Sequence, residues 1–252
     1  MKNRIWNEIL ERIYPSDLYC ICCGKIIDGS RIYRLCDDCM ESMKWATGRL
    51  CDKCGKPLSV NDPCETCFNC REHLHSFDRG YTCCEYGTNE RCIVYSMKYD
   101  DRSDIAGTIA DMMADRMLAL YEPEELAGKY DLLVPVPVSD KRKGQRGYNQ
   151  AALIAAHFSE NTGIEYRGEI LQRMRETKAM KGLAPDERKA NIRGSFAVRK
   201  KALDSISGAE CLVVDDIYTT GATIDEIASV LKAHGASTVD FLSFANGADV
   251  VK

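Results

Sequence analysis

Residues 212–223 read LVVDDIYTTGAT, and this stretch decides the fold of the chain. Its first three residues are apolar and mostly β-branched, which predicts a short buried strand. Asp215 and Asp216 follow at the carboxyl end of that strand, where open α/β sheets bind their ligands. The next residues are rich in hydroxyls and open a helix predicted from about Ile224 to His234, so their backbone N–H groups suit an anion. The stretch therefore predicts adjacent sites for a phosphate and a sugar diol.

The whole string resembles the phosphoribosyl pyrophosphate (PRPP) signature of type I phosphoribosyltransferases. By this resemblance, Asp215 and Asp216 face the ribose 2′ and 3′ hydroxyls, directly or through Mg²⁺. The residues that would hold the 5′-phosphate are Thr219, Thr220, Gly221, Ala222 and Thr223. Hypoxanthine/guanine salvage enzymes of this class carry an Asp where this chain has Thr219, which argues against 6-oxopurine salvage. The alternative is a strand, a polar turn and a capped helix without a ligand.

Composition limits the possible classes of protein. The chain has 252 residues, of which 45% are hydrophobic, so it is long enough for one large or two smaller folded domains and is not disordered. No uncharged apolar run approaches the ~18 residues of a membrane span, and the N-terminus is charged, so we expect a cytoplasmic protein without a transmembrane segment. Residues 141–200 hold 14 Lys and Arg against 6 Asp and Glu. This basic middle suits a polyanionic ligand, although an ordinary solvated face is the alternative.

Thirteen of the 14 cysteines lie between Cys20 and Cys92. With no secretion signal, such crowding predicts metal binding rather than disulfides, and the C-x-x-C spacing suits tetrahedral Zn²⁺. An internal repeat with an offset of 31 residues selects Cys67 and Cys70, rather than Cys64, as the fourth pair. We therefore predict two structural zinc sites, one of Cys20, Cys23, Cys36 and Cys39 and one of Cys51, Cys54, Cys67 and Cys70.

Some alternatives around the cysteines remain open. The ligands could be interleaved between the two repeats, as in cross-brace modules, and Cys64 could replace Cys70. His73 and His75 lie close to the second site, and we expect them at the surface. The cysteines outside the repeat are expected mostly as small buried hydrophobic residues. They are Cys22, Cys64, Cys83, Cys84 and Cys92.

The rest of the pattern predicts a mostly parallel sheet flanked by helices, an α/β fold, preceded by a small double zinc-ribbon domain. A short amphipathic helix through Trp6 and Ile13 comes before the first cysteines. Strands are expected at residues 81–86, 132–134, 212–214 and 239–244, with helices near residues 103–121 and 151–158. The domain boundary is expected near residue 78, giving a zinc-ribbon domain of residues 1–78 and a second domain of residues 79–252.

Two polar segments of the second domain suit PRPP. Residues 141–150 form a predicted basic loop after a strand, with Arg146 as the principal pyrophosphate ligand, assisted by Lys141 and Arg142. Without a ligand, this would be a basic surface loop. Residues 173–196 are polar and interrupted by Gly182 and Pro185, which is typical of a lid that excludes water from the reactive sugar carbon.

Taken together, the tandem C-x-x-C pairs, VPVP, RGYNQ, the basic segment and VVDDIYTTGAT resemble the ComF family of double-zinc-ribbon proteins with a phosphoribosyltransferase domain. The family usually carries a Gln in the lid where this chain has Met180. The resemblance implies a role in natural competence, the uptake and processing of single-stranded DNA with a helicase-like partner. It names neither the acceptor of the ribose phosphate nor the oligomeric state.

Two functions follow as hypotheses. The first is an enzyme that binds PRPP with Mg²⁺ and transfers ribose 5-phosphate to an unknown acceptor, releasing pyrophosphate, with Asp215, Asp216 and Arg146 at its centre. The second is a non-catalytic adaptor or PRPP sensor that binds single-stranded DNA or a competence partner. Two Trp and six Phe offer few stacking platforms for a single strand, so any DNA contact is expected on the basic part of the second domain.

Overall fold

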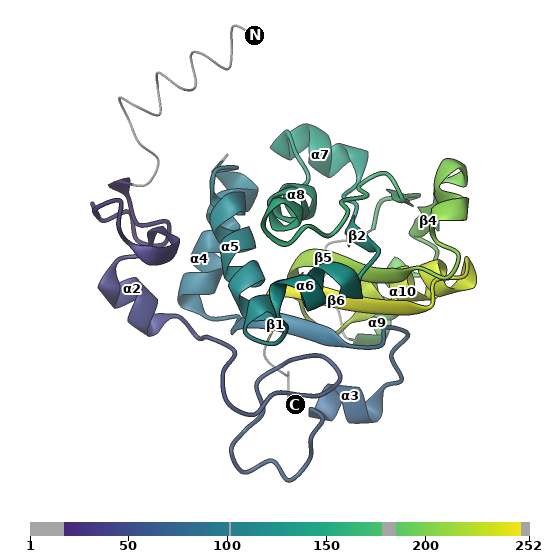
Figure 1. The fold of residues 1–252 in the computed structure, drawn as a ribbon, viewed down its shortest axis with the longest axis horizontal. Helices are drawn as coiled ribbons and strands as arrows, with labels where there is room; N and C mark the ends of the chain where they lie inside the picture. The colour runs from purple at the N-terminus through teal and green to yellow at the C-terminus, as the bar shows by residue number, and fades with distance from the viewer. Residues whose placement is uncertain (1–17, 101, 178–184, 248–252) are drawn as a thin grey trace, which may run out of the picture.

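The computed structural model describes residues 18–100, 102–177 and 185–247, and Figure 1 shows its ribbon. The helix predicted through Trp6 and Ile13 lies outside the described residues. In the part of the chain that the structure describes, none of the helices has both the length and the apolar character needed to cross a membrane.

Four parallel strands form the central sheet, in the spatial order β1-β6-β5-β2. They are β1 (Gly80–Glu85), β2 (Leu132–Pro135), β5 (Glu210–Tyr218) and β6 (Thr238–Asn246). The sequence predicted all four, and the mostly parallel sheet is confirmed. However, β5 and β6 are longer than predicted, because they pair along their whole length, from Glu210 opposite Thr238 to Tyr218 opposite Asn246.

Helices cover both faces of the sheet (Figure 1). One face carries α4 (Thr88–Tyr99), α5 (Ile105–Leu118), α6 (Pro123–Lys129) and α8 (Gln150–Thr162), and the other carries α10 (Ala222–Ala233), against which α9 (Pro185–Ile192) packs. Side chains of β5 alternate between the two cores: Leu212 and Val214 join the cluster of α5 and α8, whereas Val213 joins that of α10. Burial on both faces explains the uninterrupted apolar run that marked this strand in the sequence.

The segment predicted as a lid is anchored at both ends and partly helical. It leaves β3 (Leu171–Arg173), and it returns to β4 (Phe196–Val198), which pairs with β3 in an antiparallel ribbon. Helix α9 lies between the two strands, and residues 178–184, with Met180, lie outside the described residues. A short 3-10 helix, η3 (Lys200–Ser205), leads from β4 to β5.

The two cysteine-rich ribbons repeat each other hydrogen bond by hydrogen bond. The N–H of Cys20 donates to the oxygen of Lys25 at 2.8 Å, and that of Cys51 donates to Lys56 at 2.7 Å. In the first ribbon, η2 (Ile32–Arg34) precedes α2 (Asp37–Ser42), and in the second, α3 (Phe68–Glu72) occupies the place of α2. The 31-residue repeat read from the sequence is therefore also a repeat of the backbone.

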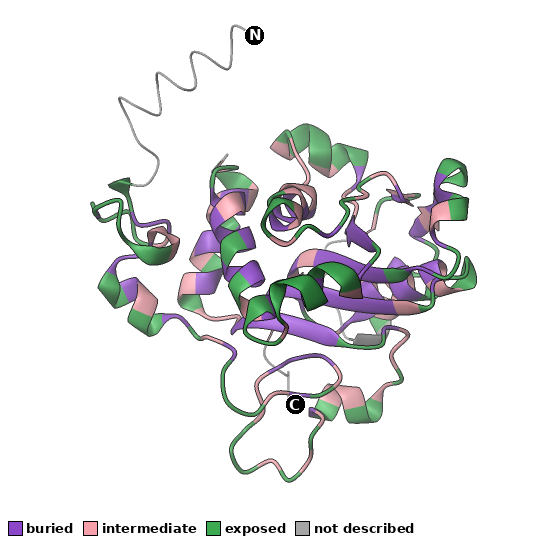
Figure 2. Cartoon of the chain, in the orientation of Figure 1, coloured by how far each residue is buried: buried purple, intermediate pink, exposed green. Residues whose placement is uncertain are grey.

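The ribbons join the hydrophobic clusters on opposite faces of the sheet rather than forming a core of their own. Ile21 and Leu35 of the first ribbon share a cluster with α5, whereas Cys54 and Phe77 share the other cluster with β6. Figure 2 shows the buried strands near the centre of the molecule and, at the left and the bottom, the two ribbons, which expose much of their surface. Hydrophobic contacts thus cross the predicted boundary near residue 78, which stays a prediction.

Candidate functional site

A pocket opens where β5 turns into α10. It is lined by Asp215, by every residue from Ile217 to Ile224, and by Arg188 of α9. The structure therefore brings Asp215 and the five predicted phosphate-binding residues together around one hollow. Arg188 comes from the segment that the sequence predicted as a lid, although the sequence did not single out this residue.

The sequence predicted the two adjacent carboxylates at the end of the strand. In the structure they lie inside β5. The strand continues through Ile217 and Tyr218 because β6 extends alongside it. On the opposite edge, β2 ends at Pro135 opposite Val214, so within the described residues β5 has no strand partner on that side from Asp215 onward. The carboxylates thus occupy the point where the sheet narrows, which opens space for a ligand.

Lys98 of α4 neutralises one of the two carboxylates. Its Nζ lies 2.5 Å from Oδ2 of Asp216, and the two side chains are only 20% and 11% exposed. The backbone N–H of Asp216 donates to Oδ1 of Asp215 at 2.9 Å. Burial and the charge of Asp216 raise the pKa of Asp215 above its usual range, although Lys98 opposes this. No pattern in the sequence indicated Lys98, because helix packing alone brings α4 to the site.

The turn between β5 and α10 is shaped for an anion. Gly221 is the N-cap residue of α10 with φ of 82°, a left-handed conformation that favours glycine. A Cβ on Gly221 would lie 2.8 Å from the hydroxyl of Tyr218 and 3.1 Å from the ring of His75, so there is also no room for a side chain. The free N–H groups at the start of a helix of 12 residues attract a phosphate.

The predicted basic loop is a helix, α7 (Asp140–Arg146). The hydroxyl of Ser139 accepts a hydrogen bond from the N–H of Arg142 and starts the helix, and Gly147 ends it in a left-handed conformation. Arg146 donates to Oε1 of Gln150 at 3.1 Å and lies 5.4 Å above the ring of Tyr99. Among the described residues, Arg146 thus contacts Gln150 and Tyr99 and not Asp215.

Two other arginines are connected with Asp215: Arg188 lines the same pocket, and Arg173 interacts with it electrostatically. Burial and the charge of Arg142 lower the pKa of Arg173, while the charge of Asp215 has the opposite effect. Arg173 also lies 5.3 Å from the ring of Phe196. Together with Arg188, they offer several guanidinium groups for phosphate oxygens. Lys141 is exposed on α7.

The predicted zinc ligands gather into two groups of four. The sulfurs of Cys20, Cys23, Cys36 and Cys39 lie within 4.8 Å of one another, and so do those of Cys51, Cys54, Cys67 and Cys70. Two sulfurs 2.3 Å from a tetrahedral Zn²⁺ lie about 3.8 Å apart, and the separations of 3.6 Å for Cys23–Cys36 and 3.7 Å for Cys54–Cys67 fit that geometry. The grouping is sequential rather than interleaved, and Cys64 is outside it.

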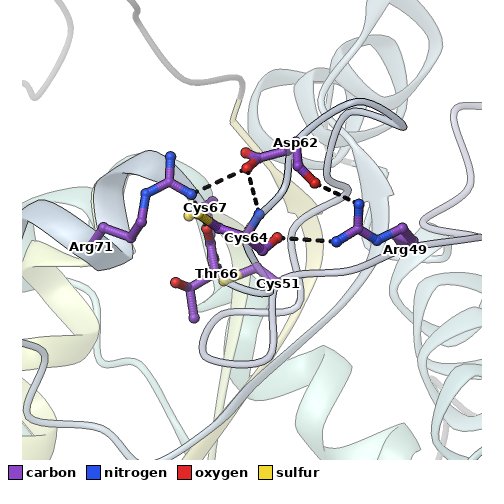
Figure 3. Close-up of polar contacts among 7 residues, drawn as sticks. All are labelled: Arg49, Cys51, Asp62, Cys64, Thr66, Cys67 and Arg71. Atoms are coloured by element: carbon purple, nitrogen blue, oxygen red, sulfur yellow. Dashed lines mark hydrogen bonds and ion pairs between the residues drawn. The ribbon is translucent and has the colours of Figure 1, made fainter.

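Polar contacts order the loop of the second ribbon around its sulfurs (Figure 3). Arg49 donates to the oxygens of Asp62 and Cys64, at 2.6 and 3.2 Å, and Arg71 donates to the oxygen of Thr66 at 2.6 Å. The N–H of Cys67 points to Sγ of Cys51 at 3.2 Å. Four thiolates leave no coordination position for a substrate, so a zinc ion bound there is structural.

The expectation that His75 lies at the surface is wrong. Its side chain is 1% exposed, and its Nδ1 lies 2.8 Å from Oδ2 of Asp225 in the first turn of α10. The sequence could not indicate this burial, because the partner of His75 lies on a helix far along the chain. Among the cysteines outside the repeat, Cys83 and Cys84 are buried as expected, whereas Cys22, Cys64 and Cys92 are partly exposed.

Comparison with protein families finds two matching domains. Residues 9–71 match the family described as double zinc ribbon domain, and residues 146–249 match the phosphoribosyl transferase domain. Both matches agree with the geometry of the cysteine groups and of the pocket. They confirm a phosphoribosyltransferase fold preceded by a double zinc ribbon.

Individual proteins are also similar to this chain. DNA utilization protein YhgH of Salmonella typhi is 27% identical over 205 residues, which cover 81% of this chain and 87% of that protein. Competence protein ComFC of Bacillus subtilis is 26% identical over 216 residues and 82% of each chain. Among solved structures, the allosteric regulatory enzyme of purine biosynthesis has a TM-score of 0.37 and 22% identity, over 59% of this chain and 29% of that one.

Proposed function

We propose that this chain, a ComF-family protein with a double zinc ribbon and a phosphoribosyltransferase domain, binds PRPP with Mg²⁺ and transfers its ribose 5-phosphate to an acceptor, releasing pyrophosphate. One observation carries the proposal: a single pocket is lined by Asp215, by the whole turn from Ile217 to Ile224, and by Arg188. It combines a carboxylate for the sugar with free N–H groups for a phosphate.

The roles of the residues follow from their positions. The turn of residues 219–223 would bind the 5′-phosphate, and Asp215 and Asp216 would face the ribose hydroxyls. Lys98 is paired with Asp216, so this carboxylate would share or exchange its cation when the sugar binds. A Mg²⁺ ion on PRPP would neutralise charge on the phosphates and the carboxylates.

Positive charge would stabilise the departing pyrophosphate. Arg188 lines the pocket, and Arg173 interacts electrostatically with Asp215 and with Arg142. Binding of pyrophosphate by Arg146 and Lys141, which the sequence suggested, is part of the same proposal. Guanidinium groups that bind pyrophosphate more strongly as its charge develops would lower the barrier to cleavage at the sugar carbon.

Calorimetry with PRPP and Mg²⁺ tests the proposal directly. We expect binding to the unmodified chain and no measurable binding to a double variant with Asp215→Asn and Asp216→Asn. Unchanged affinity in the double variant would refute the site. Release of pyrophosphate, followed while nucleobases and nucleic acids are supplied in turn, would identify the acceptor and separate catalysis from binding alone.

The proposed cellular role is in the handling of DNA during natural competence, in the cytoplasm. Similarity to proteins named for competence and for DNA utilization supports it. Because the chain resembles the ComF family, the proposal also includes binding to a helicase-like partner. Deletion of the gene should lower transformation by single-stranded DNA, while expression of the double variant shows whether PRPP binding is needed for that role.

A second candidate function, a DNA-binding adaptor, is favoured by an exposed aromatic pair beside Arg146. Tyr95 and Tyr99 of α4 are 53% and 62% exposed, and their ring centroids are 4.6 Å apart. Arg146 extends the stack over Tyr99. Aromatic rings stacked with a cation bind bases of a single strand. The counts of Trp and Phe in the sequence did not indicate this surface, because its aromatic residues are tyrosines. A protein that binds DNA and PRPP but releases no pyrophosphate with any acceptor would fit this candidate.

A further inference from the structure

The second zinc ribbon touches the turn of the proposed PRPP pocket through one histidine. Nδ1 of His75 lies 2.8 Å from Oδ2 of Asp225, and the backbone N–H of Ser76 donates to Oδ1 of the same carboxylate at 2.9 Å. Asp225 lies in the first turn of α10, and its own N–H donates to the oxygen of Gly221 at 2.7 Å. The segment after the ribbon is thus hydrogen-bonded to the helix whose N-terminus forms the turn.

His75 also supports the turn by direct contact. Its ring lies so close to Gly221 that a Cβ there would be only 3.1 Å away, and the hydroxyl of Tyr218 fills the remaining space. Tyr218 stacks on Phe241, and Phe77 packs against both rings, while His75 stacks on Phe77 at 4.7 Å. The side of Gly221 where a Cβ would lie is therefore occupied by His75 and Tyr218.

The other end of this contact reaches the loops that carry the four sulfurs. Asn69 lies between Cys67 and Cys70, and its Nδ2 is 3.4 Å from Nε2 of His75. Lys53 lies between Cys51 and Cys54, donates to the backbone oxygen of Phe77, and accepts a hydrogen bond from Gly80 at 2.8 Å. Both metal-binding loops of the second ribbon thus hold the segment that carries His75.

The first ribbon has different contacts. Its Arg34 donates to Asp104 at 2.9 Å, and its Tyr33 donates to Asp115 of α5 at 2.5 Å. Its Ile21 and Leu35 belong to the hydrophobic cluster on the other face of the sheet. The two ribbons therefore have the same backbone conformation but contact different parts of the second domain. The first ribbon thus serves as an internal control for effects of zinc on the pocket.

We propose that the second zinc site positions the phosphate-binding turn, with His75 and Asp225 as positioning residues, so that zinc at this site and PRPP in the pocket strengthen each other's binding. The inference rests on the proposed function, because it assigns regulation to the same pocket. A ribbon that loses its metal also loses the fold that fixes its loops, and His75 would then no longer hold Asp225 and Gly221. Coupling between two binding sites is reciprocal, so each ligand must favour the other by the same factor.

The first test compares variants that keep both zinc equivalents. Calorimetry with PRPP and Mg²⁺ should show about a tenfold loss of affinity in His75→Ala, because a hydrogen bond to a buried charge is lost. His75→Asn can still donate to Asp225 and should recover most of that loss. The matched control, His73→Ala, removes the other histidine of this segment, two residues earlier, and should bind as the unmodified chain does. Wild-type affinity in His75→Ala with both metals retained would overturn the inference.

The second test measures the rate of zinc release, and its main comparison uses the unmodified chain. A coloured chelator withdraws zinc from the unmodified chain with and without saturating PRPP and Mg²⁺. We expect PRPP to slow the release of one zinc equivalent about tenfold and to leave the other unchanged, and we expect His75→Ala to abolish this protection. If PRPP binds but protects neither ion, the inference fails while the proposed function stands. If PRPP does not bind at all, both fail.

Discussion

Gly55 of the second ribbon lies directly against Gly80 at the start of β1. A Cβ on Gly55 would stand 2.6 Å from the carbonyl oxygen of Gly80, and a Cβ on Gly80 would stand 2.2 Å from the ring of Phe241. The backbone of the second ribbon therefore lies directly against the start of β1, with no room for a side chain at either glycine. The repeat-related residue of the first ribbon, Gly24, has nothing within 4 Å of its Cβ position.

This difference predicts unequal effects of two related substitutions. Gly24 and Gly55 have nearly the same left-handed φ, 72° and 71°, so Ala adds a similar backbone strain of about 1 kcal/mol at either position. Gly55→Ala must in addition push the ribbon away from β1, so it should lower the free energy of unfolding by about 2–3 kcal/mol more. Urea unfolding of the two zinc-loaded variants measures the difference. Equal losses would contradict the close packing of the second ribbon.

The ion pair between Lys98 and Asp216 predicts coupling between α4 and β5. Lys98→Met leaves a largely buried carboxylate without its cation, so the free energy of unfolding should fall by about 2 kcal/mol. Adding Asp216→Asn removes the uncompensated charge and should restore most of the loss. A double-mutant cycle followed by urea unfolding isolates the interaction. Additive losses would mean that the two side chains do not interact.

Asp215 should make the protein less stable as the pH rises when no PRPP is added. Its pKa is raised in the folded state, by burial and by Asp216. Its contribution to stability is therefore fully present below the unfolded pKa of about 4 and is lost as the pH rises through the folded pKa. Without PRPP and Mg²⁺, we expect Asp215→Asn to melt above the unmodified chain at pH 7.5 and to lose that advantage near pH 4.

Asp104 provides the control of opposite sign. Burial alone would raise its pKa, but hydrogen bonds from Arg102 and Arg34 lower it below its usual range. Its contribution is present above a pH of about 4 and is lost as the pH falls through the lowered folded pKa. Asp104→Asn should therefore melt below the unmodified chain at pH 7.5. Thermal unfolding at several pH values checks both variants, and shifts of the same sign would show that the carboxylates do not differ in this way.

The sequence alone predicts the parts of the site that lie within one continuous stretch. The strand, the carboxylates and the turn of residues 212–223 depend on local spacing, so the order of the residues is enough to indicate them. The same holds for the cysteine groups, because a 31-residue offset determines which cysteines correspond. Even here, the end of β5 was placed too early, since its length depends on β6.

Residues that reach the site from elsewhere in the chain could not be predicted. Lys98 meets Asp216 only because α4 packs over the end of the sheet, and His75 is buried only because α10 supplies Asp225. Helix α7 was predicted as a loop because its glycine and its charges obscured the cap at Ser139. Contacts such as those of Lys98 and His75 depend on tertiary packing. The spacing of residues within one segment does not indicate which distant segment packs against it.

The aromatic pair of α4 predicts where a single strand of DNA would bind. Tyr99→Ala removes the side chain that lies between Tyr95 and Arg146 in the stack, so affinity for an unstructured oligonucleotide should fall about tenfold, at roughly 1–3 kcal/mol for each stacked base. Arg146→Ala should weaken binding as well and also reduce its dependence on salt. The control is Tyr19→Ala, since Tyr19 is 48% exposed on the first ribbon. Fluorescence anisotropy at two salt concentrations measures all three variants. If Tyr19→Ala weakens binding as much as Tyr99→Ala does, the strand does not bind on α4, because the loss would then follow exposed tyrosines in general.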